Sequence, residues 1–355
     1  MKDKLWIFLF LFFISAASCE KNSGGGAPLP QPPTVPVNTF TNPLLTSGPD
    51  PWIIKKDNFY YYTHTLGNRI SLWKTAKVSE LKNAPVVNVW TAPPTGPNSK
   101  NVWAPELHFL NNKWYIYYTA GSTTDLATQR TFVLENSNAD PTTGSWIDKG
   151  KIGDTNADFF SIDGSVLEYG GKLYFLWSGQ ESEADKTQRL YIAQMSNPWT
   201  LQTSRTQIAS PQYPWESMGA PPAVNEGPQI LKNPAGRVFL IYSASGCWTD
   251  DYALGMITLK EGGDPLNASD WTKSSSPVFS KNPGGSVFGP GHNSFFKSPD
   301  GTEDWILYHA NPQSGQGCGD KRSPRMQKFT WNPDGTPNFG TPVPINSNIT
   351  KPSGE

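Results

Sequence analysis

The sequence predicts an all-β fold, a five-bladed β-propeller. The main observation is a hairpin pattern that occurs five times: a polar residue opens an apolar strand, a tight polar turn follows, and an aromatic strand returns. The copies recur at intervals of roughly 60 residues, a period typical of propeller blades with several strands and long loops. Between about residues 40 and 347, no long segment has the period of a helix.

The first hairpin is Asp50 to Thr63, in which a Lys-Asp-Asn turn leads into the strand Phe-Tyr-Tyr-Tyr-Thr. The other four, in chain order, are Trp103 to Thr119, Asp163 to Ser178, Glu226 to Ser243 and Gly291 to His309. If these hairpins are the inner strands of the blades, their opening polar residues converge on the central axis. Those residues are Asp50, Glu106, Asp163, Glu226 and His292.

Each hairpin is followed by a further strand-like run, as the third strand of a blade should be. The runs are Ile70 to Trp73, Thr131 to Leu134, Leu190 to Gln194, Ala253 to Thr258 and Met326 to Trp331. Short patterns such as Val78 to Ala84 suggest a helical turn. We expect a single propeller domain over residues 39–347, because a ring of blades must close, and a C-terminal tail over 348–355.

The overall charge excludes some classes of partner. The 355 residues carry a formal net charge of -1, so no basic excess is present to bind nucleic acid or an anionic membrane surface. Aromatic residues make up 13% of the chain. Most should fill the space between the blades, and the remainder on loops could act as stacking platforms for a ligand.

The N-terminus predicts export. Residues 1–19 combine a basic start, an apolar run and Ser-Ala-Ala-Ser-Cys, which resembles the signal of a bacterial lipoprotein with Cys19 as the lipidated residue. Ordinary signal cleavage nearby is the alternative. Residues 20–38 are rich in glycine and proline and should form a flexible tether. The expected location is therefore the periplasm or the cell surface, with membrane contact only through the lipid anchor.

Two cysteines remain besides Cys19. Cys247 and Cys318 each follow the aromatic strand of the fourth or fifth hairpin. An even pair in an oxidising compartment favours a disulfide between neighbouring blades, and two buried free thiols are the alternative.

Three acids are the candidates for chemistry. Asp50, Asp163 and Glu226 each stand beside glycine or proline, where a single acid is most often an ordinary turn residue. Their recurrence at similar places in the repeat favours a functional cluster instead. Carboxyl groups crowded at one axis repel one another, so the pKa of at least one should rise. One protonated and one ionised carboxyl group are the requirement for hydrolysing a glycosidic bond.

The motifs around these residues resemble glycoside hydrolase family 43, in order and across the whole body of the chain. They are Gly48-Pro49-Asp50-Pro51-Trp52, Trp103-Ala104-Pro105-Glu106, Ser161-Ile162-Asp163-Gly164-Ser165, Asn225-Glu226-Gly227-Pro228 and Gly291-His292-Asn293-Ser294-Phe295-Phe296. The resemblance implies a five-bladed propeller among arabinofuranosidases, arabinanases and xylosidases that invert anomeric configuration.

The resemblance also implies roles for single residues. Asp50 matches the general base, Glu226 the general acid, and Asp163 the acid that orients Glu226 and modulates its pKa. His292 matches a histidine that helps to hold a structural calcium ion through water, with a hydrogen-bonded core histidine as the alternative. No organic cofactor is expected.

Five residues are candidates for contacts with the sugar. Arg325 matches an arginine that reaches toward the substrate, and Arg322 competes with it for that role. Trp103, Glu106 and Trp52 are the further substrate-binding candidates, although Trp52 could equally be a packing residue.

The extended run Gly48 to Thr65 and the loop Thr95 to Lys100 are most similar to exo-acting α-L-arabinofuranosidases. The expected activity is removal of terminal α-L-arabinofuranose from arabinan or arabinose-decorated plant polysaccharide. A β-xylosidase, an endo-arabinanase and a non-catalytic glycan-binding propeller remain alternatives. A related retaining class that cleaves fructans is disfavoured, because Asp50, Asp163 and Glu226 lack the flanking residues expected of it.

Overall fold

The computed structural model describes residues 38–355. The predicted signal segment 1–19, its Cys19 lipidation site and nearly all of the 20–38 tether lie outside the described residues. Residues Asn38–Glu355 form one compact unit. None of the helices within it combines the length and the apolar character that a membrane crossing requires.

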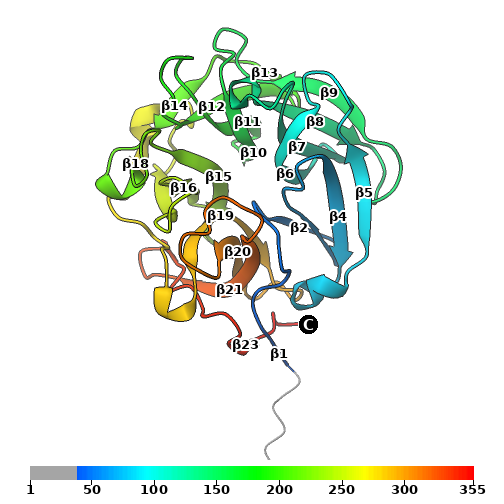
Figure 1. Ribbon diagram of the computed structural model, residues 1–355, viewed down its shortest axis with the longest axis vertical. Helices are drawn as coiled ribbons and strands as arrows, with labels where there is room; N and C mark the ends of the chain where they lie inside the picture. The colour runs from blue at the N-terminus through cyan, green and yellow to red at the C-terminus, as the bar shows by residue number, and fades with distance from the viewer. Residues whose placement is uncertain (1–37) are drawn as a thin grey trace, which may run out of the picture. The chain divides into compact units, whose positions relative to one another are not determined.

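Five sheets surround a central axis, as the sequence predicts (Figure 1). Within each sheet the strand nearest the axis comes first in the chain, and the following strands pair outward with antiparallel neighbours. Blade one contains β2 (Trp52–Lys56), β3 (Phe59–Thr63), β4 (Arg69–Thr75) and β5 (Val86–Thr91). Blade two contains β6 (Lys100–Leu110), β7 (Lys113–Gly121), β8 (Arg130–Asn136) and β9 (Ile147–Ile152).

The third blade has an extra strand. It contains β10 (Ser161–Tyr169), β11 (Lys172–Gly179), β12 (Arg189–Asn197), β13 (Thr200–Leu201) and β14 (Thr206–Ala209), and both β13 and β14 pair with β12. Blade four contains β15 (Asn225–Lys232), β16 (Val238–Ala244), β17 (Ala253–Leu259) and β18 (Trp271–Lys273). Blade five contains β19 (Phe288–Lys297), β20 (Asp304–Asn311), β21 (Ser323–Trp331) and β22 (Pro337–Asn338).

All five predicted third strands are present, as β4, β8, β12, β17 and β21, and the predicted helical turn is the 3₁₀ helix η1 (Val78–Asn83). The outermost strands are not among the predicted ones. They are short or largely exposed, so they carry little of the apolar pattern that marks a strand in the sequence.

The hydrophobic core is divided into five clusters, one between each pair of neighbouring blades. Between the last and first blades, for example, Tyr60 packs edge-on against Phe296, and Phe296 stacks on Trp305. Flat aromatic rings fill the gap between two stacked sheets with a large apolar area. The aromatic return strands of the hairpins therefore serve mainly the packing of the blades.

Both ends of the described chain close the ring. β1 (Thr39–Phe40) pairs with β23 (Ile349–Thr350), and the Asn42 side chain exchanges hydrogen bonds with the backbone of Met326 in blade five. The Glu355 carboxylate accepts a hydrogen bond from the backbone N–H of Val78. The prediction of a separate tail over 348–355 is wrong, because these residues pair and pack as part of the propeller.

The inner strands share one backbone feature that places the site. In blades two to five, the pairing register of the inner strand slips at its upstream end, and a residue with positive φ lies in the slip. These residues are Ala104 (φ 41), Asp163 (φ 56), Gly227 (φ 56) and His292 (φ 45), and Asp50 (φ 56) has the same conformation just before β2. Such bulges redirect side chains and occur often beside active sites.

The positive-φ residues also correct the sequence alignment of the repeats. Asp50, Asp163 and His292 occupy equivalent places, but Glu226 stands one residue before its bulge and Glu106 two residues after. Glu226 therefore enters the axis from a different direction than the two aspartates. Glu106 belongs to a layer further along the strands.

Candidate active site

The carboxyl group of Asp50 is buried and held by two neighbours. The Arg322 guanidinium donates to Oδ1 at 2.8 Å, and the Thr65 hydroxyl donates to Oδ2 at 2.7 Å. The same Thr65 oxygen accepts the backbone N–H of Ala104 at 2.7 Å, so blade two fixes the orientation of the Thr65 hydroxyl. Asp50 is therefore fixed at both oxygen atoms.

Arg322 keeps Asp50 ionised. Burial is the largest single influence and raises the pKa of Asp50, but Arg322, the His292 and His309 side chains and the Thr65 hydroxyl together outweigh it and hold this pKa well below its usual range. Two histidines, His292 and His309, each place Nδ1 at 3.5 Å from Oδ1. Burial lowers the pKa of both rings, and His309 Nδ1 accepts the Asp50 N–H, so these rings are neutral at neutral pH. An ionised carboxylate here can accept a proton from water.

Glu226 has the opposite environment. The Tyr252 hydroxyl donates to Oε1 at 2.8 Å, and burial raises the pKa of Glu226 to about 7, with the charge of Asp50 acting in the same direction. A carboxyl group with this pKa carries a proton in mildly acidic and neutral solution, so it can act as a general acid. Asp50 and Glu226 thus have pKa values displaced in opposite directions, as one base and one acid require.

Asp163 is coupled to Glu226 through the backbone. Its Oδ2 accepts the N–H of Gly227 at 2.9 Å, and Gly227 directly follows Glu226. Burial, together with the nearby charge of Glu226, raises the pKa of Asp163 well above its usual value. The pair therefore retains at least one proton near neutral pH. This geometry suits the predicted role of Asp163 in orienting the acid, which stays a prediction.

In three blades, the backbone N–H of the positive-φ residue donates a hydrogen bond to a side chain from the second strand of the preceding blade. Thr119 accepts the N–H of Asp163, Ser243 that of His292, and His309 that of Asp50. The backbone carrying each functional side chain is therefore fixed across a blade boundary. Catalytic geometry depends on such support, because small displacements of a reacting group are costly.

Glu106 and Trp52 lie in a second layer. Glu106 is 2% exposed, pairs with His108 Nε2 at 2.9 Å and accepts a hydrogen bond from the Gln229 amide. The Trp52 indole donates to the Leu107 carbonyl and lies against the His108 ring, at 4.7 Å between ring centroids. Both side chains are thus engaged with the channel wall, which favours packing over sugar contact.

The prediction that Arg325 reaches the sugar is wrong. Its side chain is fully buried inside blade five and donates to the carbonyls of Ser286 and Ala310. The competing candidate, Arg322, lies at the site and contacts Asp50. Arg322 precedes β21, whereas Arg325 lies within that strand, and residues on a central strand of a stacked sheet face a blade interface.

Trp103 lies where a sugar contact is possible. It is partly exposed and stands one residue before the Ala104 bulge, the position that Glu226 occupies in blade four. Its role in binding stays a prediction. His292 is 5% exposed and lies beside Asp50, so it belongs to the acid layer.

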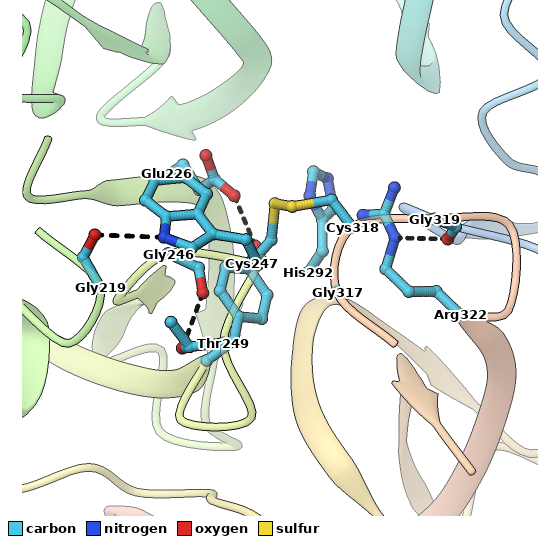
Figure 2. Close-up of a disulfide and its surroundings, with 12 residues drawn as sticks. Gly219, Glu226, Gly246, Cys247, Thr249, His292, Gly317, Cys318, Gly319 and Arg322 are labelled. Atoms are coloured by element: carbon cyan, nitrogen blue, oxygen red, sulfur yellow. Dashed lines mark hydrogen bonds between the residues drawn. A yellow bond between two sulfur atoms is a disulfide. The ribbon is translucent and has the colours of Figure 1, made fainter. Parts of the chain in front are cut away.

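The expected disulfide is present. Cys247 and Cys318 are bonded, with 5.1 Å between their Cα atoms, and they join the β16–β17 loop to the β20–β21 loop at the rim of the site. Figure 2 shows this bridge with Glu226, His292 and Arg322. The prediction of a bridge between neighbouring blades is confirmed.

Sequence reasoning missed Thr65, Tyr252 and His309 as partners of the acids. Thr65 lies two residues after β3 and His309 lies near the end of β20, and a polar residue is ordinary near the end of a strand. Tyr252 sits in a loop with no repeat pattern. The sequence contains one pattern that could have pointed to such partners: the strand opposite each bulge has Thr, Ser or His at or near its end.

The chain resembles known proteins over nearly all of the described body. Residues 40–337 match the family described as "Glycosyl hydrolases family 43". The chain is 43% identical over 319 residues to an "Extracellular exo-alpha-(1->5)-L-arabinofuranosidase" of Streptomyces avermitilis, covering 88% of this chain and 65% of that protein. It is 39% identical over 288 residues to a protein of the same name from Streptomyces chartreusis, covering 80% and 84% of the two chains.

A solved structure agrees with these sequences. The crystal structure of an alpha-L-arabinofuranosidase from Lactobacillus brevis superimposes with a TM-score of 0.81 at 39% identity, covering 87% of this chain and 98% of the other. The chain spans about two thirds of the length of the Streptomyces avermitilis relative. The family match covers most of the chain, in a five-bladed propeller whose axis holds one ionised and one proton-bearing carboxyl group, and the chain therefore belongs to glycosyl hydrolase family 43.

Proposed function

We propose that this protein is an inverting exo-acting α-L-arabinofuranosidase that releases terminal arabinofuranose from arabinan or arabinose-decorated plant polysaccharide. The observation that carries the proposal is the pairing of an ionised Asp50 beside Arg322 with a protonated Glu226. The names of the Streptomyces and Lactobacillus relatives support the choice of sugar.

In the proposed reaction, Asp50 removes a proton from water as the water attacks the anomeric carbon. Glu226 gives its proton to the glycosidic oxygen, and the bond between that oxygen and the anomeric carbon breaks. Inversion requires room for water between the two carboxyl groups, whereas a retaining enzyme brings them closer. Asp163 keeps Glu226 in place through the Gly227 backbone.

A substrate panel tests the proposal. We expect hydrolysis of an aryl α-L-arabinofuranoside and release of single arabinose units from linear arabinan, with little action on an aryl β-D-xyloside. Release of oligosaccharides from arabinan would favour an endo-arabinanase, and preference for the xyloside a β-xylosidase. Binding measured by calorimetry without turnover would favour a glycan-binding propeller. NMR of the first-formed anomer distinguishes inversion from retention.

We propose that the protein is exported and anchored by lipid at Cys19. The word "Extracellular" in the names of the Streptomyces relatives supports export. The cysteine after Ser-Ala-Ala-Ser supports lipidation. We expect labelled palmitate to be incorporated into the full-length chain in bacterial cells, and Cys19→Ala to abolish the label while activity is retained. Equal labelling of the variant would overturn the anchor.

We also propose a structural calcium ion held through water beside His292. Within residues 38–355, no three acidic, histidine or cysteine side chains are placed to bind a metal directly. Support comes from the propeller axis, where the buried His292 ring lies beside Asp50 and within the influence of the Glu106 charge, and a neutral ring can accept a hydrogen bond from a metal-bound water. No catalytic step passes through the ion.

Chelation tests the calcium proposal. We expect EDTA to lower the melting temperature by several degrees and added calcium to restore it, because a ligand that binds only the folded state stabilises it. His292→Ala should lose the calcium effect. An unchanged melting temperature in EDTA would make His292 a core histidine only.

A further inference from the structure

Two loops form a connected rim at the end of the propeller where the acids lie. Residues 245–252 join β16 to β17, and residues 312–322 join β20 to β21. The Cys247–Cys318 disulfide links them, and the Asp250 carboxylate accepts hydrogen bonds from the Ser314 hydroxyl and the Gly315 N–H. The two loops therefore act as one rigid unit across the boundary of blades four and five.

This unit contacts both catalytic acids. Tyr252 donates to Glu226 from the first loop, and Arg322 donates to Asp50 from the end of the second. Arg322 is anchored in turn by its Nε donating to the Gly319 carbonyl (Figure 2). A ligand that binds to the rim therefore has a fixed position relative to both Glu226 and Asp50.

Trp248 is the exposed side chain of this rim. It follows Cys247 directly and is 44% exposed, although its indole N–H is committed to the Gly219 carbonyl at 3.1 Å. A Cβ added at Gly219 would lie 2.6 Å from the indole nitrogen, and one at Gly246 would collide with the ring. The ring therefore rests on two glycines, which support it and leave apolar area open to solvent.

Met218 extends the same surface. It is 45% exposed, and its backbone is bonded to the first loop: Gly246 N–H donates to the Met218 carbonyl, and Met218 N–H donates to the Ser245 hydroxyl. The segment that carries Met218 and Gly219 leads into Glu226. Trp248 and Met218 are two of the seven exposed large apolar residues in the described part of the chain, and both are attached to the loop whose Tyr252 contacts Glu226.

We propose that Trp248 and Met218 form the binding site for the leaving sugar, the residue on the far side of the cleaved bond. This inference rests on the proposed function. Glu226 must protonate the oxygen that departs with the leaving sugar, so that sugar has to lie on the Glu226 side of the site. A fixed aromatic face offers a large apolar area at low conformational-entropy cost, as the apolar face of a sugar ring requires.

Two substrates separate leaving-sugar binding from catalysis. An α-(1→5)-linked arabinobiose carries a leaving sugar, and α-L-arabinofuranosyl fluoride carries none. We expect Trp248→Ala to lower kcat/KM for the disaccharide about 10- to 30-fold, the range of a truncated aromatic anchor, through a raised KM. Its kcat/KM for the fluoride should stay within about two-fold of wild type.

Matched variants guard against a folding defect. Met218→Ala removes one of the two side chains and leaves the indole–Gly219 hydrogen bond in place, so it should give a smaller loss on the disaccharide alone. Trp248→Phe should retain most activity. Phe59→Ala removes a similarly exposed aromatic at the opposite end of a blade-one hairpin and should change neither substrate.

Equal losses on both substrates in Trp248→Ala, or no loss on the disaccharide, would overturn the inference. Failure of the wild-type protein to hydrolyse either substrate would instead overturn the proposed function.

Discussion

Asp50→Asn lowers kcat/KM about 10²- to 10⁴-fold on both arabinobiose and α-L-arabinofuranosyl fluoride, if Asp50 is the base that activates water. Both substrates require attack by water, so a better leaving group does not restore the rate. Asparagine keeps the shape of the side chain, accepts from Arg322 through its carbonyl oxygen and tolerates the positive φ of Asp50. The loss would therefore report the missing negative charge. Initial rates with both substrates, with melting temperatures in parallel, measure it.

Asp57→Asn is the matched control for this experiment. Asp57 also has positive φ, at 55°, and belongs to the same hairpin, but its carboxylate is exposed and pairs with Lys56. We expect wild-type rates. An Asp50→Asn enzyme that kept near wild-type turnover on the fluoride would show that another group activates water.

The fold was predictable because each repeat contains a strand of large apolar and aromatic residues. A strand that is buried between two stacked blades must be apolar or aromatic, so β3, β7, β11, β16 and β20 stand out in the sequence. The closing contacts did not stand out, because β1 and β23 are two residues each and their partners lie about three hundred residues apart. Local pattern carries no signal for such a pairing.

The acids were predictable, but their geometry was not. The motifs identify Asp50, Asp163 and Glu226 as the acids. They do not show that Glu226 lies one residue before the positive-φ position of its bulge, whereas the two aspartates occupy that position. The choice between Arg322 and Arg325 could not be made from the sequence for the same reason. Both arginines fit the motif, and only the start of β21 shows that one lies inside the blade and the other beside Asp50. Contacts between chain segments, rather than residue types, decide these points.

The pH dependence follows from the two displaced pKa values. Asp50 has a pKa well below its usual range, so the base stays ionised through the whole mildly acidic region. Glu226 has a pKa of about 7, so the acid is protonated below that pH and loses its proton above it. The rate on arabinobiose should therefore be constant in mildly acidic solution and fall as pH rises through about 7. The apparent pKa belongs to the coupled pair of Glu226 and Asp163.

Glu226→Gln should separate the acid from the base. Glutamine keeps an oxygen that accepts from Tyr252 but has no proton to transfer, so we expect kcat/KM for arabinobiose to fall about 10²- to 10⁴-fold. Fluoride departs without a carboxylic acid, so hydrolysis of α-L-arabinofuranosyl fluoride should fall far less. With the fluoride, the rate of Glu226→Gln should not fall as pH rises through about 7, because this leaving group needs no proton from the acid. Asp50→Asn should instead lose activity on both substrates.

The control for Glu226→Gln is Glu261→Gln, which changes an exposed glutamate in the turn after β17. It should leave both rates and the pH profile as in the wild type. If Glu226→Gln lost equal activity on the two substrates, Glu226 would not be the proton donor. Selective loss on the disaccharide, with the fluoride retained, excludes a folding defect and a defect in the shared arabinose site, because either would lower both rates. A loss in kcat then identifies the missing proton donor, whereas weaker binding of the leaving sugar raises KM.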